Sequence, residues 1–209
     1  MTAGYRLYGR RGSGSFAVQV ALEEARVGYE KEWVEREPAA VDAYRRIFPT
    51  GKVPGLQLPD GTRMFESAAI LLHLASAHPD ALGPAPGTPS HPAFLQWMIF
   101  LSANTYEAVL RMYYSSRYSA RGESDVAAIS EQARTEFIVS LELIAPSLDP
   151  YVLGPMYSIA DVYLYMLATW WPDDKEQLFA KLPALRRHAG LVSSRPAVAK
   201  VEADHATLA

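Results

Sequence analysis

A proline-rich segment near the middle of the chain divides the sequence into two parts. Five of the fifteen prolines fall between Pro79 and Pro92. Proline lacks a backbone N–H and fixes its own φ, so we expect neither a helix nor a central strand here. We predict an extended linker over residues 79–92. It would join a domain of residues 1–78 to a second domain of residues 93–209.

Short strand and helix patterns alternate before this linker. We predict strands at 5–9 and 29–35 and helices at 15–25, 39–48 and 67–77, with Ser15 capping the first helix. The runs GLQLP and TRMFE flank Pro59-Asp60-Gly61, a turn sequence that favours a β-hairpin. The predicted order is therefore β-α-β-α-β-β-α, an α/β unit.

Helical spacing dominates after the linker, where no convincing strand is found. Long helices are predicted at 93–118 and at 124–148, the latter interrupted by Pro146. Ser158 and Asp161 form a capping-box pattern ahead of a run that is apolar nearly all round, which predicts a buried helix. Shorter helices are expected around 174–181, 183–191 and 196–206. The second domain is thus predicted to be all-α.

Composition excludes several classes of function. The 209 residues are 49% hydrophobic and carry a net charge of −3, which favours neither a nucleic-acid nor a membrane partner. The chain has no cysteine, so disulfides, thiolate metal sites and cysteine nucleophiles are excluded. We see no signal peptide and no run long enough to span a membrane, and we expect a cytoplasmic protein.

Four features together resemble the soluble, bacterial-like glutathione S-transferases, of a serine-type or atypical kind. They are PTGKVPGL at 49–56, FES at 65–67, the position of the linker, and YSIADVYLY at 157–165. The resemblance implies a thioredoxin-like N-terminal domain followed by an all-helical domain. It also implies a homodimeric detoxification enzyme that uses glutathione as co-substrate and needs no metal.

The resemblance assigns a glutathione site to two short segments. Pro54 would follow a cis peptide bond, so that the backbone of Val53 pairs with the tripeptide as a sheet edge does. Ser67 would bind the γ-glutamyl carboxylate at a helix N-terminus, Glu66 the ligand amino group, and Lys52 the glycine carboxylate. Taken singly, Pro54 also fits an ordinary strand-edge proline and Ser67 an ordinary helix cap.

The group that stabilises the glutathione thiolate is less well defined by the sequence. The segment LYGRRGSGSF offers Ser13 as first choice and Ser15 as second, although Ser15 also suits a helix cap. Tyr8 is third, by analogy with tyrosine-type enzymes, and backbone N–H groups of the glycine-rich turn are a fourth choice. Arg10 and Arg11 would raise the local positive potential or remain solvated.

The resemblance places the electrophile pocket on the first long helix of the second domain, where Tyr106 and Tyr113 share a face. The alternative role for each tyrosine is packing in the core or at a dimer interface. The leading function is conjugation of glutathione to a small, mostly apolar electrophile. The alternatives are a non-catalytic binding or regulatory protein, and a specialised glutathione-dependent isomerase, lyase or peroxidase.

Overall fold

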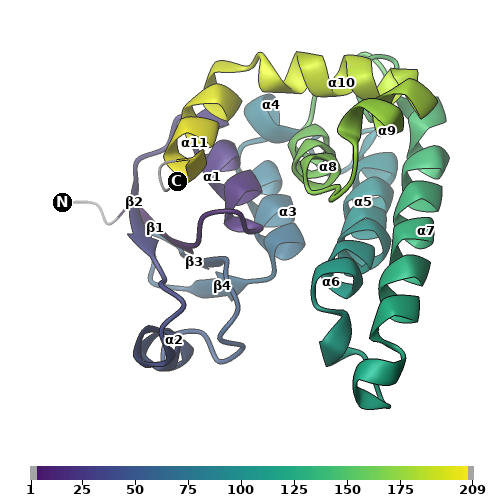
Figure 1. The fold of residues 1–209 in the computed structure, drawn as a ribbon. Helices are drawn as coiled ribbons and strands as arrows, with labels where there is room; N and C mark the ends of the chain where they lie inside the picture. Colours follow the sequence, from purple (N-terminus) through teal and green to yellow (C-terminus); the bar gives the residue numbers. More distant parts are fainter. Residues whose placement is uncertain (1–3, 207–209) are drawn as a thin grey trace. The chain divides into compact units, whose positions relative to one another are not determined.

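The fold was determined as a computed structural model, which describes residues 4–206. These residues form two compact units (Figure 1). The first comprises the residues up to Thr88 together with those from Ser193 onward, and the second spans Pro89–Val192. The division at Thr88 falls inside the predicted linker. The last helix, which we had assigned to the helical domain, packs with the first unit.

The first unit has the predicted β-α-β-α-β-β-α order and is thioredoxin-like. Its elements are β1 (Tyr5–Gly9), α1 (Ser15–Glu24), β2 (Tyr29–Trp33), α2 (Pro38–Arg45), β3 (Gly55–Gln57), β4 (Arg63–Phe65), α3 (Ser67–Ala77), α4 (Pro79–Leu82) and α11 (Pro196–Ala206). The predicted α/β class and the hairpin are both confirmed.

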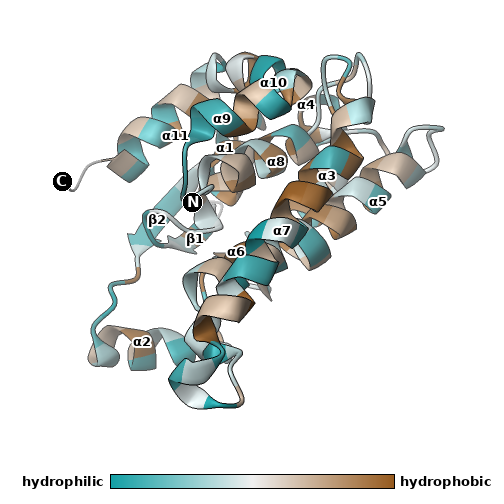
Figure 2. Cartoon of the chain, turned by 45° about the vertical axis from the view of Figure 1, so that its right-hand side comes forward, coloured by the Kyte–Doolittle hydropathy of each residue, from teal (hydrophilic) through white to brown (hydrophobic). Residues whose placement is uncertain are grey.

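A four-stranded mixed sheet organises this unit, in the order β2-β1-β3-β4. β1 is parallel to β2 and antiparallel to β3, and β3 is antiparallel to β4. α1 and α3 pack against each other, and α11 returns to lie beside α1 (Figure 1). Figure 2 shows the hydrophobic character of α3 and the hydrophilic character of β2, whose residues alternate between half-buried and exposed as in an edge strand.

Two local predictions are wrong. The segment 79–92 is not wholly extended, because Pro79–Leu82 forms a helical turn; proline is tolerated at the first helical position, where its missing N–H has no partner to lose. Ser15 is not the helix cap. Gly14 occupies that position without a side-chain cap bond, and Ser15 is the first helical residue.

The second unit is helical, as predicted. It contains α5 (His91–Phe100), the π-helix η1 (Leu101–Tyr106), α6 (Glu107–Tyr113), η2 (Ser115–Arg117), η3 (Gly122–Ser124), α7 (Val126–Ile144), η4 (Ala145–Ser147), α8 (Ile159–Thr169), α9 (Lys175–Lys181) and α10 (Pro183–Ser193). The π-helix interrupts the single helix that we predicted over 93–118. A π-helical insertion shifts the register of the residues that follow it.

The predicted capping box of α8 is present and is more extensive than the sequence indicates. Asp161 accepts hydrogen bonds from the backbone N–H of Ser158 (2.8 Å) and of Val152 (2.7 Å). It also lies 3.0 Å from Nε2 of His188 on α10. Asp161 and His188 are both fully buried, so this carboxylate joins three segments of the second unit away from the surface.

We predict that Asp161→Ala lowers the free energy of unfolding by at least about 2 kcal/mol, because it removes a helix cap and leaves buried donors without an acceptor. Denaturant titration followed by circular dichroism measures this change. The matched control is Asp173→Ala, which breaks a partly exposed pair with Arg134. The control substitution should lower the free energy of unfolding by less than about 1 kcal/mol. Equal losses in the two variants would contradict the central role of Asp161.

The backbone at the start of α3 is unusual. Glu66, the N-cap residue, has φ 70° and ψ 111°. Positive φ brings the side chain of a non-glycine residue too close to its own backbone, at a cost of about 1–2 kcal/mol. Such conformations collect at functional sites, where the surrounding structure maintains them. Glu66 is exposed, so packing of its own side chain does not explain the strain.

We therefore predict that Glu66→Gly is more stable than Glu66→Ala by about 1 kcal/mol, since glycine adopts positive φ without steric cost. Gln132 is exposed within α7, where the helical backbone favours alanine over glycine. At this control position the alanine variant should therefore be more stable than the glycine variant, by about 1 kcal/mol. Thermal and denaturant unfolding of the four variants gives both differences. An alanine variant at least as stable as the glycine variant at position 66 would show that this conformation is not strained.

Candidate functional site

The register of the sheet brings three predicted site segments to one edge. Gly55, at the start of β3, pairs with Tyr8 of β1 on one side and with Phe65 of β4 on the other. Continuing the antiparallel register by one residue places Pro54 between Gly9 and Glu66. Val53, the start of α3 and the loop after β1 therefore converge where the sheet ends.

The segment 52–55 is held by an aromatic cluster. Tyr8, Val34, Tyr44 and Phe48 form a buried group against which Val53 packs. The Tyr44 hydroxyl donates to the Lys52 carbonyl at 3.0 Å. Burial raises the pKa of Tyr44, so this donor keeps its proton. The peptide bond between Val53 and Pro54 is cis.

Gly55 allows this cluster to approach the strand. A Cβ atom at this position would lie 2.6 Å from Phe48 Cζ and 2.7 Å from the Tyr44 hydroxyl oxygen. Either contact is too close for a side chain. Gly55 therefore permits the close packing that fixes the neighbouring Val53 and Pro54.

The backbone of Val53 is available to a ligand. Within residues 4–206, its N–H and C=O form no hydrogen bond. The side chain of Lys52 beside it is exposed. An extended N–H and C=O pair at the end of a sheet is the arrangement to which a peptide adds as a further strand.

Ser13 and Ser15 share one carbonyl in the loop after β1. The Ser13 hydroxyl donates to the Arg10 carbonyl oxygen at 2.7 Å, and the Ser15 hydroxyl donates to the same atom at 2.9 Å. The two hydroxyl oxygens are 2.9 Å apart. The two hydroxyl groups have two protons for these three contacts. One hydroxyl can therefore turn to another acceptor while the other still bonds to the Arg10 carbonyl and holds the loop.

The two serines differ in exposure. Ser15 is fully buried, and its Oγ also accepts from the Arg10 backbone N–H at 3.1 Å. A Cβ at Gly9 would lie 2.8 Å from that Oγ, so Ser15 fits closely against the end of β1. Ser13 is half-buried. Ser15 therefore closes the loop, while Ser13 retains access to a ligand.

The other candidates near this loop have structural partners. Tyr8 is 4% exposed and packs edge-on against Phe48 at 5.2 Å between ring centroids. The Arg10 guanidinium donates to the backbone carbonyls of Val34 (2.9 Å) and Glu35 (3.1 Å). Arg11 lies over the ring of Trp33 at 4.7 Å. The two arginines thus join the loop to the last residue of β2 and to the two residues that follow it, rather than standing free in solvent.

Ser67 begins α3 and is 5% exposed, whereas Glu66 before it is exposed. The first backbone N–H groups of a helix point outward and carry the positive end of its dipole. An anion is therefore favoured at Ser67, and the neighbouring Glu66 carboxylate suits a cation. This edge is suited to a small ligand that carries both charges.

Tyr106 and Tyr113 both contact Trp170 within the second unit. Tyr106 lies 5.5 Å from it between ring centroids, and the Tyr113 hydroxyl donates to the Trp170 carbonyl at 2.8 Å. Burial raises the pKa of Tyr113. Sequence reasoning missed Trp170, because it follows a helix that is apolar nearly all round. The three form a partly exposed aromatic group.

Among residues 4–206, no group of three or more histidine, aspartate or glutamate side chains is arranged to hold a metal ion. In the same range, no helix combines the length and the hydrophobicity that crossing a bilayer requires.

Known proteins resemble this chain in sequence and in fold. Residues 15–77 match the family model for the glutathione S-transferase N-terminal domain. The uncharacterized GST-like protein YncG of Escherichia coli K12 is 27% identical over 80% of this chain and 82% of its own length. Glutathione S-transferase GstA of Escherichia coli O157:H7 is 23% identical over 79% of this chain and 81% of its own length.

Solved structures agree with these sequence relatives. A glutathione transferase homologue from Sulfitobacter with bound glutathione has a TM-score of 0.84 and 26% identity, covering 97% of this chain and 98% of that one. A sphingomonad glutathione S-transferase complexed with glutathione has a TM-score of 0.79 and 27% identity, covering 97% of this chain and 100% of that one. In sequence over residues 15–77, and in fold over nearly its whole length, the chain is similar to members of the glutathione S-transferase superfamily.

Proposed function

We propose that this protein binds glutathione at the edge of its sheet and transfers the glutathione thiolate to a small electrophile. The observation that carries the proposal is the register that aligns Val53, the start of α3 and the loop after β1. The two glutathione-bound structures described above support the choice of ligand.

Each part of the tripeptide has a counterpart at this edge. The backbone of Val53 pairs with the peptide group of the ligand. The γ-glutamyl carboxylate binds at Ser67, where the N–H groups of α3 begin, and Glu66 attracts the ammonium group beside it. Lys52 neutralises the glycine carboxylate. This orientation directs the sulfur towards the loop that carries Ser13.

Thiolate formation is the chemical task of this loop. A free thiol has a pKa of about 8.5 and is mostly protonated at neutral pH. Each unit by which the site lowers that pKa requires about 1.36 kcal/mol of preferential thiolate stabilisation. One donated hydrogen bond to a charged group supplies about 1.5–3 kcal/mol. Ser13 supplies it when its hydroxyl turns from the Arg10 carbonyl, which the Ser15 hydroxyl continues to occupy.

The transfer step is a nucleophilic substitution or addition. With an aryl halide, the thiol proton passes to water, the thiolate forms a carbon–sulfur bond, and the halide leaves with its bonding electrons. We assign Tyr106, Tyr113 and Trp170 to the electrophile, because aromatic rings with polar ends suit a mostly apolar molecule.

A second function is favoured by one observation. Both serine hydroxyls already donate to the Arg10 carbonyl. If those bonds persist when glutathione binds, the protein holds the ligand without activating it. The alternative is therefore a non-catalytic glutathione-binding protein.

Calorimetry with glutathione, followed by a conjugation assay with a generic aryl halide, tests the proposal. We expect binding and turnover in the wild type, and a decrease in kcat/KM of about 10- to 100-fold in Ser13→Ala, because one bond to the thiolate is lost. The pH at which kcat/KM rises should move upward in that variant. Ser15→Ala should chiefly lower thermal stability, because Ser15 closes the loop.

The possible results lead to different conclusions. Binding without turnover in the wild type would favour the non-catalytic function. No binding would refute the proposal altogether. Turnover that survives intact in Ser13→Ala but is lost in a folded Ser15→Ala would move the thiolate contact to Ser15.

A further inference from the structure

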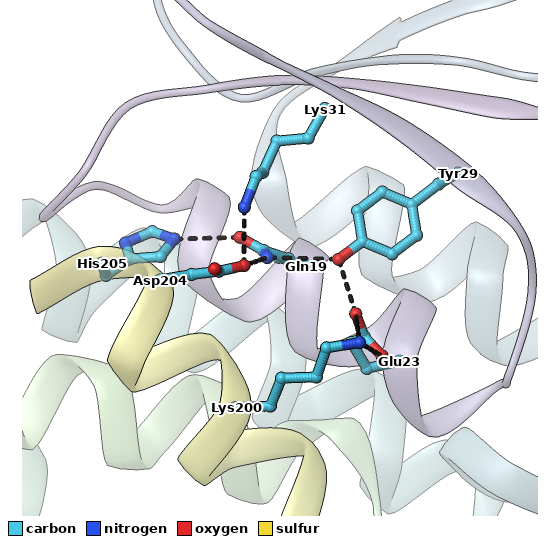
Figure 3. A network of polar contacts seen from close by, with 7 residues as sticks. All are labelled: Gln19, Glu23, Tyr29, Lys31, Lys200, Asp204 and His205. Atoms are coloured by element: carbon cyan, nitrogen blue, oxygen red, sulfur yellow. Dashed lines mark hydrogen bonds and ion pairs between the residues drawn. The ribbon is translucent and has the colours of Figure 1, made fainter. Parts of the chain in front are cut away.

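The C-terminal helix α11 is tied to α1 and β2 by ion pairs. Lys31 lies 2.6 Å from Asp204, and Lys200 lies 2.8 Å from Glu23 (Figure 3). Just before the helix, Arg195 donates to both carboxylate oxygens of Glu24, at 2.6 and 2.9 Å. A bidentate pair of this kind fixes orientation as well as distance. The helix therefore has a defined position against α1.

This position brings His205 to the loop after β1. The His205 ring meets the rings of Phe16 (5.4 Å between centroids) and Trp33 (5.3 Å), both nearly perpendicular to it. Its Nδ1 accepts from the backbone N–H of Gly12 at 3.4 Å. Its Nε2 lies 3.2 Å from Oε1 of Gln19 (Figure 3).

The hydrogen bonds define which ring nitrogen carries the proton. Gln19 directs its amide nitrogen to Asp204 Oδ2 (2.6 Å) and to the Tyr29 hydroxyl (3.1 Å). Because a carboxylate only accepts, the amide oxygen of Gln19 must face His205, whose Nε2 must then be the donor. The backbone N–H of Gly12 can only donate, so Nδ1 must be unprotonated and accept this hydrogen bond. The contacts are satisfied together only by neutral, Nε2-protonated histidine.

The surroundings keep His205 neutral. Burial, reinforced by the positive charges of Lys31 from β2 and Arg11 from the loop and opposed by Asp204 on α11, lowers the pKa of His205 to about 4. The unfolded chain takes up this proton near pH 6.5. Acidification from there to about pH 4 therefore favours the unfolded state, and Nδ1 remains an acceptor at neutral pH.

Gly12 has few other restraints. It is exposed, its φ is 63°, and a Cβ placed there would meet no atom within 4 Å. Glycine reaches many backbone conformations at little cost, so a rotation at Gly12 would redirect the next residue, Ser13. A contact that fixes the Gly12 N–H therefore also fixes the direction of the Ser13 hydroxyl.

We propose that His205 is a positioning residue, which holds Gly12 through Nδ1 and thereby sets the direction of Ser13 towards the glutathione sulfur. The catalytic consequence rests on the proposed function; the restraint on the loop does not. His205 lies 193 positions from Gly12 in the sequence, so the end of the chain completes a site built by its beginning.

Amide hydrogen exchange at Gly12, measured by NMR without ligand, tests the restraint. We expect exchange to become about 5- to 10-fold faster in His205→Phe, which keeps an aromatic ring between Phe16 and Trp33 but removes the acceptor. His205→Asn places an oxygen near the position of Nδ1 and should restore most of the protection. Ala199→Ser, at an exposed position of the same helix outside its ion pairs, should leave Gly12 exchange unchanged.

The pKa of the bound glutathione thiol, from its ultraviolet absorbance, tests the consequence. If His205 positions Ser13, His205→Phe should raise this pKa and lower kcat more than it raises KM, while His205→Asn restores both. A purely structural role would lower thermal stability without moving the thiol pKa.

The two measurements separate the failure of this inference from the failure of the proposed function. Unchanged Gly12 exchange in His205→Phe would refute the positioning role whether or not glutathione binds. Faster exchange with an unchanged thiol pKa would refute its catalytic consequence. A wild type that binds no glutathione would refute the proposed function, and Gly12 exchange would still decide the restraint.

Discussion

The pairing of β3 with both of its neighbours is the constraint on which the candidate site depends. β3 has three residues, and its first, Gly55, is paired with Tyr8 on one side and Phe65 on the other. A shift of one residue would reverse the side-chain directions of β3 and would separate Val53 from the start of α3. The close packing of Phe48 and Tyr44 against Gly55 opposes such a shift, because it leaves no room for a side chain.

The charges at this edge follow from the same geometry. β1 and β4 both end here, so the helices that follow them, α1 and α3, both begin here and present their N-terminal N–H groups. The edge therefore attracts negative charge at two places, and Glu66 contributes a negative charge of its own. A zwitterion fits this pattern better than a simple anion, which Glu66 would repel.

Local signals predicted most of the fold. The Asp60-Gly61 pair predicted the hairpin, and Ser158 with Asp161 predicted the start of α8, because each signal acts within a few residues. The wrong predictions concern residues that can adopt a second local structure or that bond to a residue elsewhere in the chain. Pro79 starts a helical turn instead of preventing one. Ser15 bonds to Arg10 across the loop instead of capping its own helix.

Only those residues of the candidate site that lie within a recognisable sequence motif could be predicted from the sequence. Val53, Pro54, Glu66 and Ser67 lie within one continuous stretch, so the resemblance reached them together. Neither His205 nor Trp170 belongs to such a motif. The role of His205 requires the path of the whole chain, because its contact with Gly12 depends on the position of α11 against α1 and β2. The choice between Ser13 and Ser15 needed their burial, which spacing does not provide.

A crystal structure of the protein with glutathione tests the central claim most directly. The account predicts that the ligand peptide pairs with the Val53 backbone, that one carboxylate lies at the N-terminus of α3, and that the sulfur is within hydrogen-bond distance of Ser13. Glutathione bound elsewhere, or bound here with its sulfur directed away from the loop after β1, would contradict it.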